Sequence, residues 1–266
     1  MGIVLFPEEE MWTTFTLSPG VTYVARFPGA SIFLKADGFL WGVAVEYPSA
    51  PQRPAPARNI RKAPDGLSWR YSALLGAAEL TLRPALPARP YEVQLAQAVS
   101  ILPGVELDGY ICLPLQAEIL ASEGTVLAAL SLLPRKYSWF GTPQEGVLCD
   151  AVVSGFSAAE EVGRFLSDPD PAVAVCPVTV KNNSTEGMDL SLLCIPTDIL
   201  SIYGREGIYA TERVLCAFSA DGLQVKPRRG MDPLLGRMEV RHPARKGPEE
   251  RFFVRGIGLL RHIAGI

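Results

Sequence analysis

The sequence predicts an all-β or β-rich protein of antiparallel, sandwich-like sheets, with one short helix near residues 157–167. Three observations support this fold class. Of the 266 residues, 23 are Pro and 24 are Gly, and Pro breaks helices by fixing φ and removing an N–H donor. The apolar runs between these breakers are short and rich in β-branched and aromatic residues, which is typical of strands. Many runs also alternate apolar and polar side chains, as a half-buried sheet requires.

Composition bounds the classes of protein that remain. Hydrophobic residues make up 48% of the chain and the formal net charge is -3, so the chain has enough apolar residues for one or two cores. No stretch approaches the ~18 uninterrupted apolar residues of a membrane-spanning helix, so no membrane span is expected. The first apolar run ends at Pro7 before three acidic residues, which does not fit a secretory signal. We therefore expect a cytoplasmic protein.

The first half of the chain is predicted to be strands and turns. The expected strands are residues 21–26, 39–46, 67–71, 78–83 and 91–95. Residues 48–64 contain five Pro and several Arg, so we expect an exposed loop of polyproline character that cannot pair as a central strand. Residues 51–54 also match the short PxxP pattern of peptide ligands, as the less favoured alternative. Residues 125–133 fit either a buried strand or a helix.

One helix is predicted in the second half. Ser157 and Glu160 have the spacing of a capping box, and Val162, Phe165 and Leu166 fall on one helical face. Two Pro at 169 and 171 then end the helix. Strands are expected again at residues 172–180, 189–195, 208–218 and 223–226.

Two segments share an order of features that suggests an internal repeat. The first contains Cys112-Leu113-Pro114, Glu118-Ile119-Leu120, Ser138-Trp139-Phe140-Gly141 and Val147-Leu148-Cys149. The second contains Cys194-Ile195-Pro196, Asp198-Ile199-Leu200, Ser201-Ile202-Tyr203-Gly204 and Val214-Leu215-Cys216. A duplication would give two similar lobes, which we place at residues 1–155 and 156–266. Chance likeness between β-rich segments, and a single domain, are the alternatives.

Residues 136–149 carry a family resemblance. Their Lys-Tyr, aromatic-Gly and Gly-Val-aliphatic-Cys order resembles a segment of DUF432, a prokaryotic family catalogued as a domain of unknown function. The strand pattern after Ala172 is similar more loosely. The resemblance implies an archaeal or bacterial cytoplasmic setting. It brings no activity, ligand or site residue.

The side chains that usually carry catalysis or bind metals form no recognisable motif. The five cysteines lie in apolar, strand-like runs, so buried free thiols are expected. The two histidines have no metal-ligand partner at a suitable spacing, and no Cys-x-x-Cys occurs. We therefore predict no catalytic residue, no metal site and no cofactor. A Cys149–His242 nucleophile pair is an alternative that only the fold could assemble.

Positive charge gathers towards the carboxyl terminus. Ten Lys and Arg lie between residues 226 and 261, against four acidic residues. The guanidinium fork suits phosphate, so this segment is a candidate anion-binding site. Its candidate residues are Arg228, Arg229, Arg237, Arg241, Arg245 and Lys246. The competing interpretation is a solvated surface whose arginines pair with acids elsewhere in the chain.

Our leading functional hypothesis is a non-enzymatic scaffold or interaction protein whose partner is another protein or a second copy. The first alternative is binding of an anion or nucleic acid through the arginine-rich end, with an affinity that falls steeply with salt. The second is a hydrolase or sugar-active enzyme in a sandwich cleft, which rests on fold analogy alone.

Overall fold

The computed structural model describes residues 11–37, 40–73, 78–228, 230–247 and 252–255. The all-β prediction is confirmed, because the described elements are strands in four sheets apart from a few helical turns. The helical elements are η1 (Ala159–Glu161), α2 (Val162–Ser167) and η2 (Pro233–Leu235). No helix in these ranges has the length and apolar character needed to cross a membrane.

Contacts group the chain into two compact units. Unit 1 comprises Met1–Ala85, Pro114–Pro134 and Asp170–Ala172, and unit 2 comprises Leu86–Leu113, Arg135–Pro169 and Val173–Ile266. This division differs from the expected boundary between residues 155 and 156. The difference arises because strand β10 (Gln116–Ala121), from the middle of the chain, pairs with strand β7 (Ala78–Ala85) of unit 1, and such remote pairing leaves no mark in local composition.

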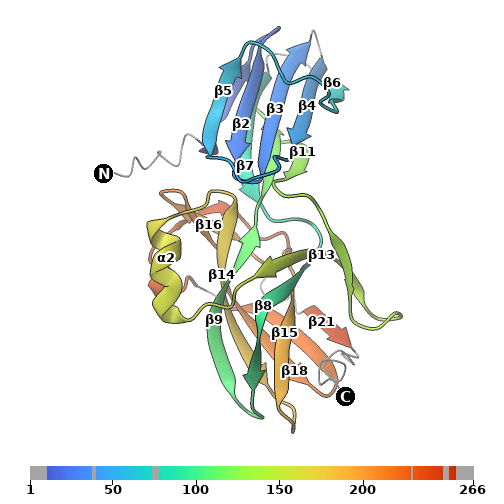
Figure 1. Ribbon diagram of the computed structural model, residues 1–266, viewed down its shortest axis with the longest axis vertical. Coiled ribbons are helices and arrows are strands. Elements are labelled where there is room, and N and C mark those ends of the chain that lie inside the picture. Colours follow the sequence, from blue (N-terminus) through green and yellow to red (C-terminus); the bar gives the residue numbers. More distant parts are fainter. Residues whose placement is uncertain (1–10, 38–39, 74–77, 229, 248–251, 256–266) are drawn as a thin grey trace. The chain divides into compact units, whose positions relative to one another are not determined.

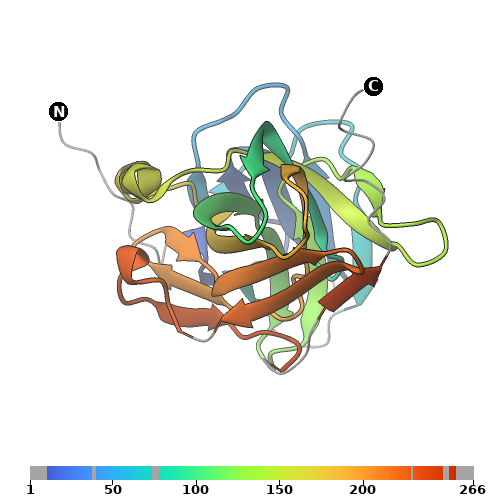
Figure 2. The ribbon, with the colours of Figure 1, turned by 90° about the horizontal axis from the view of Figure 1, so that it is seen from below.

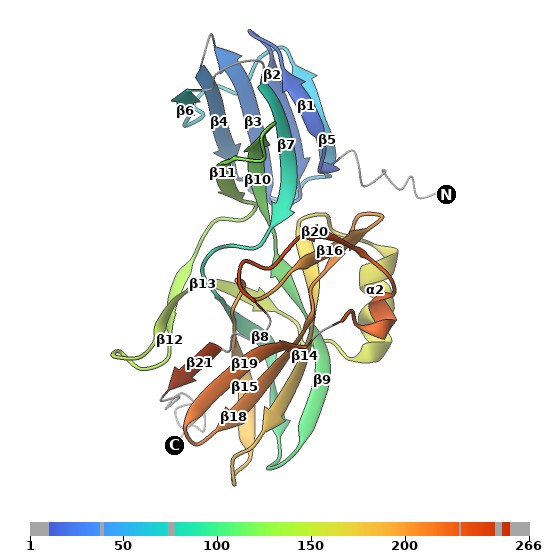
Figure 3. The ribbon, with the colours of Figure 1, turned by 180° about the vertical axis from the view of Figure 1, so that it is seen from behind.

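Unit 1 is built from two sheets (Figures 1 and 3). One has the order β1-β7-β10-β11, with β1 (Thr14–Leu17), β7 (Ala78–Ala85), β10 (Gln116–Ala121) and β11 (Val126–Ser131). The other has the order β5-β2-β3-β4-β6, with β5 (Ala55–Ile60), β2 (Thr22–Phe27), β3 (Ala30–Asp37), β4 (Leu40–Glu46) and β6 (Arg70–Ala73). Both sheets contribute fully buried side chains, among them Phe27, Ile32, Trp41, Leu80 and Ile119.

The proline-rich segment is partly a strand, so the prediction of a loop over residues 48–64 is wrong for β5. This strand lies at the end of its sheet and pairs with β2 alone among the described strands. Pro56 is tolerated there because an edge strand can leave one side without ladder donors. Gln52, within the PxxP pattern, donates from Nε2 to Phe27 O at 2.9 Å and Ser31 Oγ at 2.8 Å. The Gln52 side chain, between Pro51 and Pro54, is therefore held by unit 1 itself.

Unit 2 also contains two sheets, which form two layers (Figure 2). The first has the order β12-β13-β8-β15, with β12 (Tyr137–Phe140), β13 (Val147–Ser154), β8 (Tyr91–Ile101) and β15 (Met188–Ile195). The second has the order β20-β16-β17-β14-β18-β19-β21, and β9 also pairs with β14. Its strands are β9 (Glu106–Pro114), β14 (Val173–Asn182), β16 (Ile202–Arg205), β17 (Ile208–Ala210), β18 (Arg213–Ser219), β19 (Gly222–Arg228), β20 (Glu239–His242) and β21 (Phe252–Arg255).

Most strand pairs are antiparallel, as predicted, but unit 2 includes parallel pairs. β13 runs parallel to β8, and β14 runs parallel to β17 and β18. The run expected as one strand at 208–218 is two strands, because β17 pairs with the start of β14 and β18 with its end. Between them Thr211 donates its N–H to Val175 O at 3.0 Å.

The predicted helix exists, but its predicted capping box is wrong. Ala158 is the N-cap of η1, and no side chain caps it. Ser157 instead exchanges two backbone hydrogen bonds with Tyr110, each 2.9 Å long, so it remains extended. The predicted apolar face is confirmed, because Val162 is buried in a cluster against which Phe165 and Leu166 also pack.

The two segments of the suggested repeat differ in secondary structure at one of their four matched positions. Residues 118–120 belong to strand β10, whereas residues 198–200 lie in and after a turn. The likeness is one of sequence order at these positions, and it does not extend to their secondary structure.

Candidate interaction surface

The predicted anion-binding residues do not all present free charge. Arg228 ends β19 and Arg237 follows η2, and both are exposed. Arg241 forms an ion pair with Glu239 at 3.5 Å. Arg229 lies outside the described residues. No described contact connects these arginine side chains to one another, and the anion site stays a prediction.

The last two candidates hold the chain to unit 2. Arg245 donates to the carbonyl oxygen of Leu86 at 2.9 Å, to that of Pro87, and to Thr197 Oγ1 at 3.3 Å. Lys246 forms an ion pair with Asp198 at 3.0 Å, and its backbone N–H donates to Asp198 O at 2.8 Å. These contacts give both cations a structural role.

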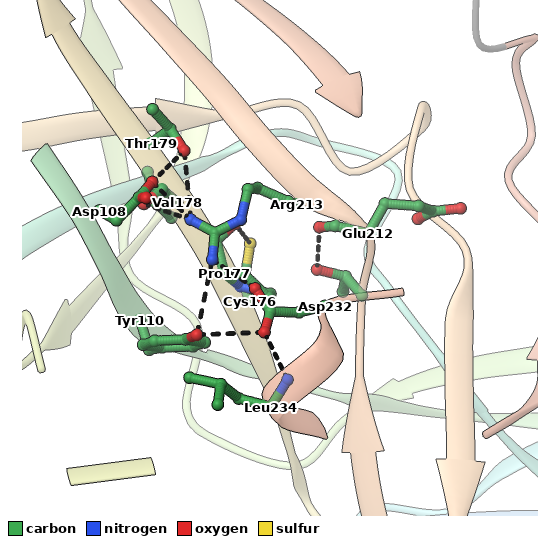
Figure 4. Close-up of polar contacts among 11 residues, drawn as sticks. Asp108, Tyr110, Cys176, Pro177, Val178, Thr179, Glu212, Arg213, Asp232 and Leu234 are labelled. Carbon is green, nitrogen blue, oxygen red and sulfur yellow. Dashed lines mark hydrogen bonds and ion pairs between the residues drawn. The ribbon is translucent and has the colours of Figure 1, made fainter. Parts of the chain in front are cut away.

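A polar network, buried except at Asp108, lies at Arg213 on the second sheet of unit 2 (Figure 4). Nη1 of Arg213 donates to Asp108 Oδ1 at 2.8 Å and to Thr179 Oγ1 at 3.1 Å, and Nη2 donates to Asp232 Oδ2. Asp232 Oδ1 accepts from the Tyr110 hydroxyl at 3.2 Å and from the N–H of Leu234 at 3.0 Å.

This network is saturated within the protein. Burial alone would lower the pKa of Arg213, but Asp232 and Asp108 outweigh burial and raise it. Burial, and then Asp232, raise the pKa of Tyr110, so its hydroxyl stays protonated. Because two carboxylates already neutralise the guanidinium, the network can fasten η2 and β9 to the sheet but offers little affinity for a further anion.

Exposed apolar side chains gather on the β12–β13 hairpin, which projects at the side of unit 2 (Figures 1 and 3). Tyr137, Trp139 and Leu148 are 55%, 50% and 43% exposed. Tyr137 and Trp139 share a face of β12 because strand side chains alternate, and Leu148 is the register partner of Trp139 on β13. We call these three side chains the hairpin surface.

The turn of this hairpin is fixed by its own contacts. Trp139 Nε1 donates to Thr142 O at 2.8 Å, and the N–H of Gly146 donates to the same oxygen at 2.8 Å. A Cβ at Gly146 would lie 2.3 Å from Trp139 Nε1 and 2.7 Å from Phe140 O, so only Gly fits without a shift. The structure therefore has a turn between β12 and β13 at residues 141–146, and this turn orients Trp139.

A charged row crosses the sheet beside the hairpin surface. The register places Tyr137, Asp150 and Tyr91 side by side on β12, β13 and β8. Arg89 lies over the Tyr137 ring at 4.8 Å, and its Nη1 is 3.9 Å from Asp150 Oδ1. The Asp150 side chain is 9% exposed, and its Oδ1 has no hydrogen bond.

Charge and burial shift the titration of this row. Burial raises the pKa of Asp150, and Arg135 and Arg89 offset this only in part. Hydrogen bonding from Arg135, and then from Arg89, holds the pKa of Tyr137 below its ordinary value of 10.0. Arg135 and Lys136 are exposed and follow each other directly before β12.

Sequence reasoning singled out residues 136–149 for their order but missed Arg89 and Asp150 as neighbours. The signal available in the sequence was a single charged residue, Asp150, within the otherwise apolar residues 147–153. The partner strand β8 lies far away in the chain, so no local pattern indicated it.

The thiols and the histidine do not form a recognisable catalytic group. None of the five cysteines, all of which are described, forms a disulfide, and four of them are buried. Cys149 Sγ lies 3.9 Å from Cys194 Sγ, whereas His242 lies on β20 of the second sheet, with its Nδ1 2.8 Å from Pro243 O. Hydrogen bonding to Cys149, together with burial, raises the pKa of Cys194. Among the described ranges, no group of three or more His, Cys, Asp or Glu is arranged to hold a metal ion.

The fold and this surface define an all-β protein of two compact units, with an exposed aromatic hairpin flanked by cations on the second unit. The chain belongs to the family described as "Protein of unknown function (DUF432)", whose family model matches residues 11–251. No curated protein and no solved structure matches the chain.

Proposed function

We propose that this chain is a non-enzymatic interaction protein that binds a partner protein through the hairpin surface. The observation that carries the proposal is the exposure of Tyr137, Trp139 and Leu148 together on one face of an edge hairpin. Tyr and Trp are enriched among the residues that dominate binding energy at protein interfaces. Large apolar side chains that are grouped, and not scattered, mark interaction sites on proteins.

The hairpin is suited to recognition because its side chains are already oriented. Trp139 is held by its hydrogen bond to Thr142 O, and the Tyr137 ring contacts the Arg89 guanidinium. Ordering a side chain on binding costs about 0.5–1.5 kcal/mol, so side chains that are ordered beforehand retain more of their contact energy.

The test is site-specific photo-crosslinking in the source cells. A benzophenone side chain at Leu148 should give a discrete adduct with one partner protein, and Trp139→Ala should reduce the adduct yield about tenfold. The matched control is the same probe at Val153, which is also exposed but lies on the opposite face of β13. Equal adducts from positions 148 and 153, or no adduct from position 148, would refute the proposal.

Binding of an anion or nucleic acid through the carboxyl-terminal arginines stays a prediction of second rank. Arg245 and Lys246 are already bound to unit 2, which leaves exposed Arg228 and Arg237 as its best described candidates.

A further inference from the structure

We propose that the partner supplies an acidic side chain. In this arrangement Arg89, Arg135 and the Tyr137 hydroxyl form an oxyanion site, and an extended partner segment adds along β12 to place its carboxylate there. The inference rests on the proposed function and adds the chemistry of the partner to it.

The first argument is that the charge of Arg89 is only loosely matched. Elsewhere in the described chain Arg83 makes two bonds to Glu118 Oε2, at 3.1 and 2.6 Å, and Arg213 binds two carboxylates. The contact of Arg89 with Asp150 is 3.9 Å, well beyond the ~2.7–2.9 Å of a charge-assisted hydrogen bond. The Arg89 side chain is also 43% exposed, so a ligand can reach it.

The second argument is the balance of charge around Tyr137. Arg89, Arg135 and Lys136 bring three positive charges to the start of β12, and Asp150 is the one acidic side chain in the row. Arg135 and Lys136 make no ion pair with a described residue. The Asp150 side chain is only 9% exposed and its Oδ1 has no hydrogen bond, so the exposed side of this group is electropositive. Such a site favours an anion.

The third argument is the position of β12 in its sheet. β12 pairs with β13 alone among the described strands, so its other edge is available to an added strand. Side chains directly opposite each other in a sheet have Cβ atoms about 4.5–5.5 Å apart. A partner residue opposite Tyr137 would thus share its face and lie within reach of the guanidiniums.

The same register fixes a second position in the partner. The residue two places along lies on the same face, opposite Trp139 and next in line to Leu148. The partner segment therefore has the pattern acidic–any–apolar, with the acidic residue beside Tyr137. Strand addition supplies main-chain bonds, and these two side chains supply specificity.

The experiment measures the anisotropy of fluorescein-labelled nine-residue peptides titrated with the full chain at low salt. The probe has one Glu and one Leu two residues apart in a Ser/Thr host. One comparison peptide replaces Glu with Lys. Another places Leu three positions after Glu instead of two, which puts the two side chains on opposite faces of the strand. We expect the probe to bind at least about tenfold more tightly than either, the effect of one hydrogen bond to a charged group.

Variants of the chain separate the inference from folding defects. Arg89→Gln should weaken the probe about tenfold and leave the Lys peptide unchanged. The double variant Arg89→Gln/Asp150→Asn removes the uncompensated carboxylate that the single variant leaves behind, and should show the same loss. Arg164→Gln is the matched control, because Arg164 is an exposed arginine on α2.

The outcomes distinguish the two proposals. Equal binding of the Glu and Lys peptides, with both lost in Trp139→Ala, would overturn the acidic partner and retain the hairpin surface. Competition by millimolar inorganic phosphate as strong as that of the unlabelled probe would show a small-anion site and also overturn it. Failure of every peptide to bind would end the strand-addition inference, while the crosslinking result decides the proposed function independently.

Discussion

Replacing Asp232 with Ala is expected to destabilise unit 2 by about 3 kcal/mol. The substitution removes the buried partner of Arg213, the acceptor of the Tyr110 hydroxyl and the N-cap of η2. Losing an N-cap costs about 1 kcal/mol, and breaking a buried ion pair from one side costs about 3–5 kcal/mol. We take about 3 kcal/mol for both losses together, the lower end of this range, because Arg213 keeps Asp108 at 2.8 Å and its side chain is 12% exposed.

Two further substitutions apportion this loss. Asp232→Asn keeps a side-chain oxygen that can cap η2 but removes the charge, so we expect about half the effect. Asp108→Asn removes a carboxylate that is 66% exposed, and exposed pairs contribute about 0–1 kcal/mol. The loss of stability should therefore decrease in the order Asp232→Ala, Asp232→Asn, Asp108→Asn. This order tests whether burial determines how much each carboxylate contributes to the stability of unit 2.

Hydrogen exchange followed by mass spectrometry is the suitable assay, because a chain of two compact units need not unfold in one step. Amides of β14 and β18 should exchange about a hundredfold faster in Asp232→Ala than in the wild type, since 1.36 kcal/mol corresponds to tenfold. Strands of unit 1 should be unchanged. An Asp108→Asn effect as large as that of Asp232→Ala, or an Asp232→Ala effect below about 1 kcal/mol, would refute the reasoning.

Three further predictions follow from the hairpin surface and the thiols. Gly146→Ala should accelerate amide exchange over residues 140–147 and weaken partner binding, because its Cβ would meet backbone oxygens, whereas Gly155→Ala has open space and should change neither. In an alkaline titration followed at 295 nm, Tyr137 should ionise below pH 10 in the wild type, and Arg135→Gln should move this step upwards. Between this lowered pKa and the ordinary value of about 10, the folded state binds fewer protons than the unfolded state, so Tyr137 should add stability as the pH rises through this range. An ionisation of Tyr137 at the same pH in Arg135→Gln as in the wild type would contradict this. With Ellman's reagent at pH 8, the partly exposed Cys112 should react first and the four buried thiols only after denaturation, since burial raises the pKa of Cys176 to about 12; fast reaction of a second thiol in the native protein would show that the core is open.

Strands with a clear local pattern were predicted close to their observed starts. β2, β4, β7 and β8 begin within one residue of their predicted ranges, because alternation and β-branched residues are local signals. β5 was missed because Pro56 argues against a central strand, and only the sheet order reveals that β5 is an edge. The Ser157 cap failed because tertiary pairing with Tyr110 overrode local propensity.

The candidate surface was less accessible to sequence reasoning. The turn at residues 141–146 could be predicted, and with it the nearness of Trp139 and Leu148. Arg89 and Asp150 are 61 positions apart and meet only because β8 runs parallel to β13. Conversely, the charge excess at the carboxyl end was visible, but the bonds of Arg245 to Leu86 and Pro87 depend on the folded chain.

The interleaving of the two units has a consequence for synthesis on the ribosome. The shortest amino-terminal fragment that contains every strand of unit 1 ends after Ser131, where β11 is complete. By then β8 and β9 have been made, yet their partners β13, β14 and β15 start at Val147 or later. β8 and β9 therefore have unpaired edges at a stage when unit 1 can already fold, and unpaired strand edges can pair with other chains. We expect nascent chains halted between residues 114 and 147 to be the most aggregation-prone. A chaperone that covers β8 should reduce aggregation most at that stage.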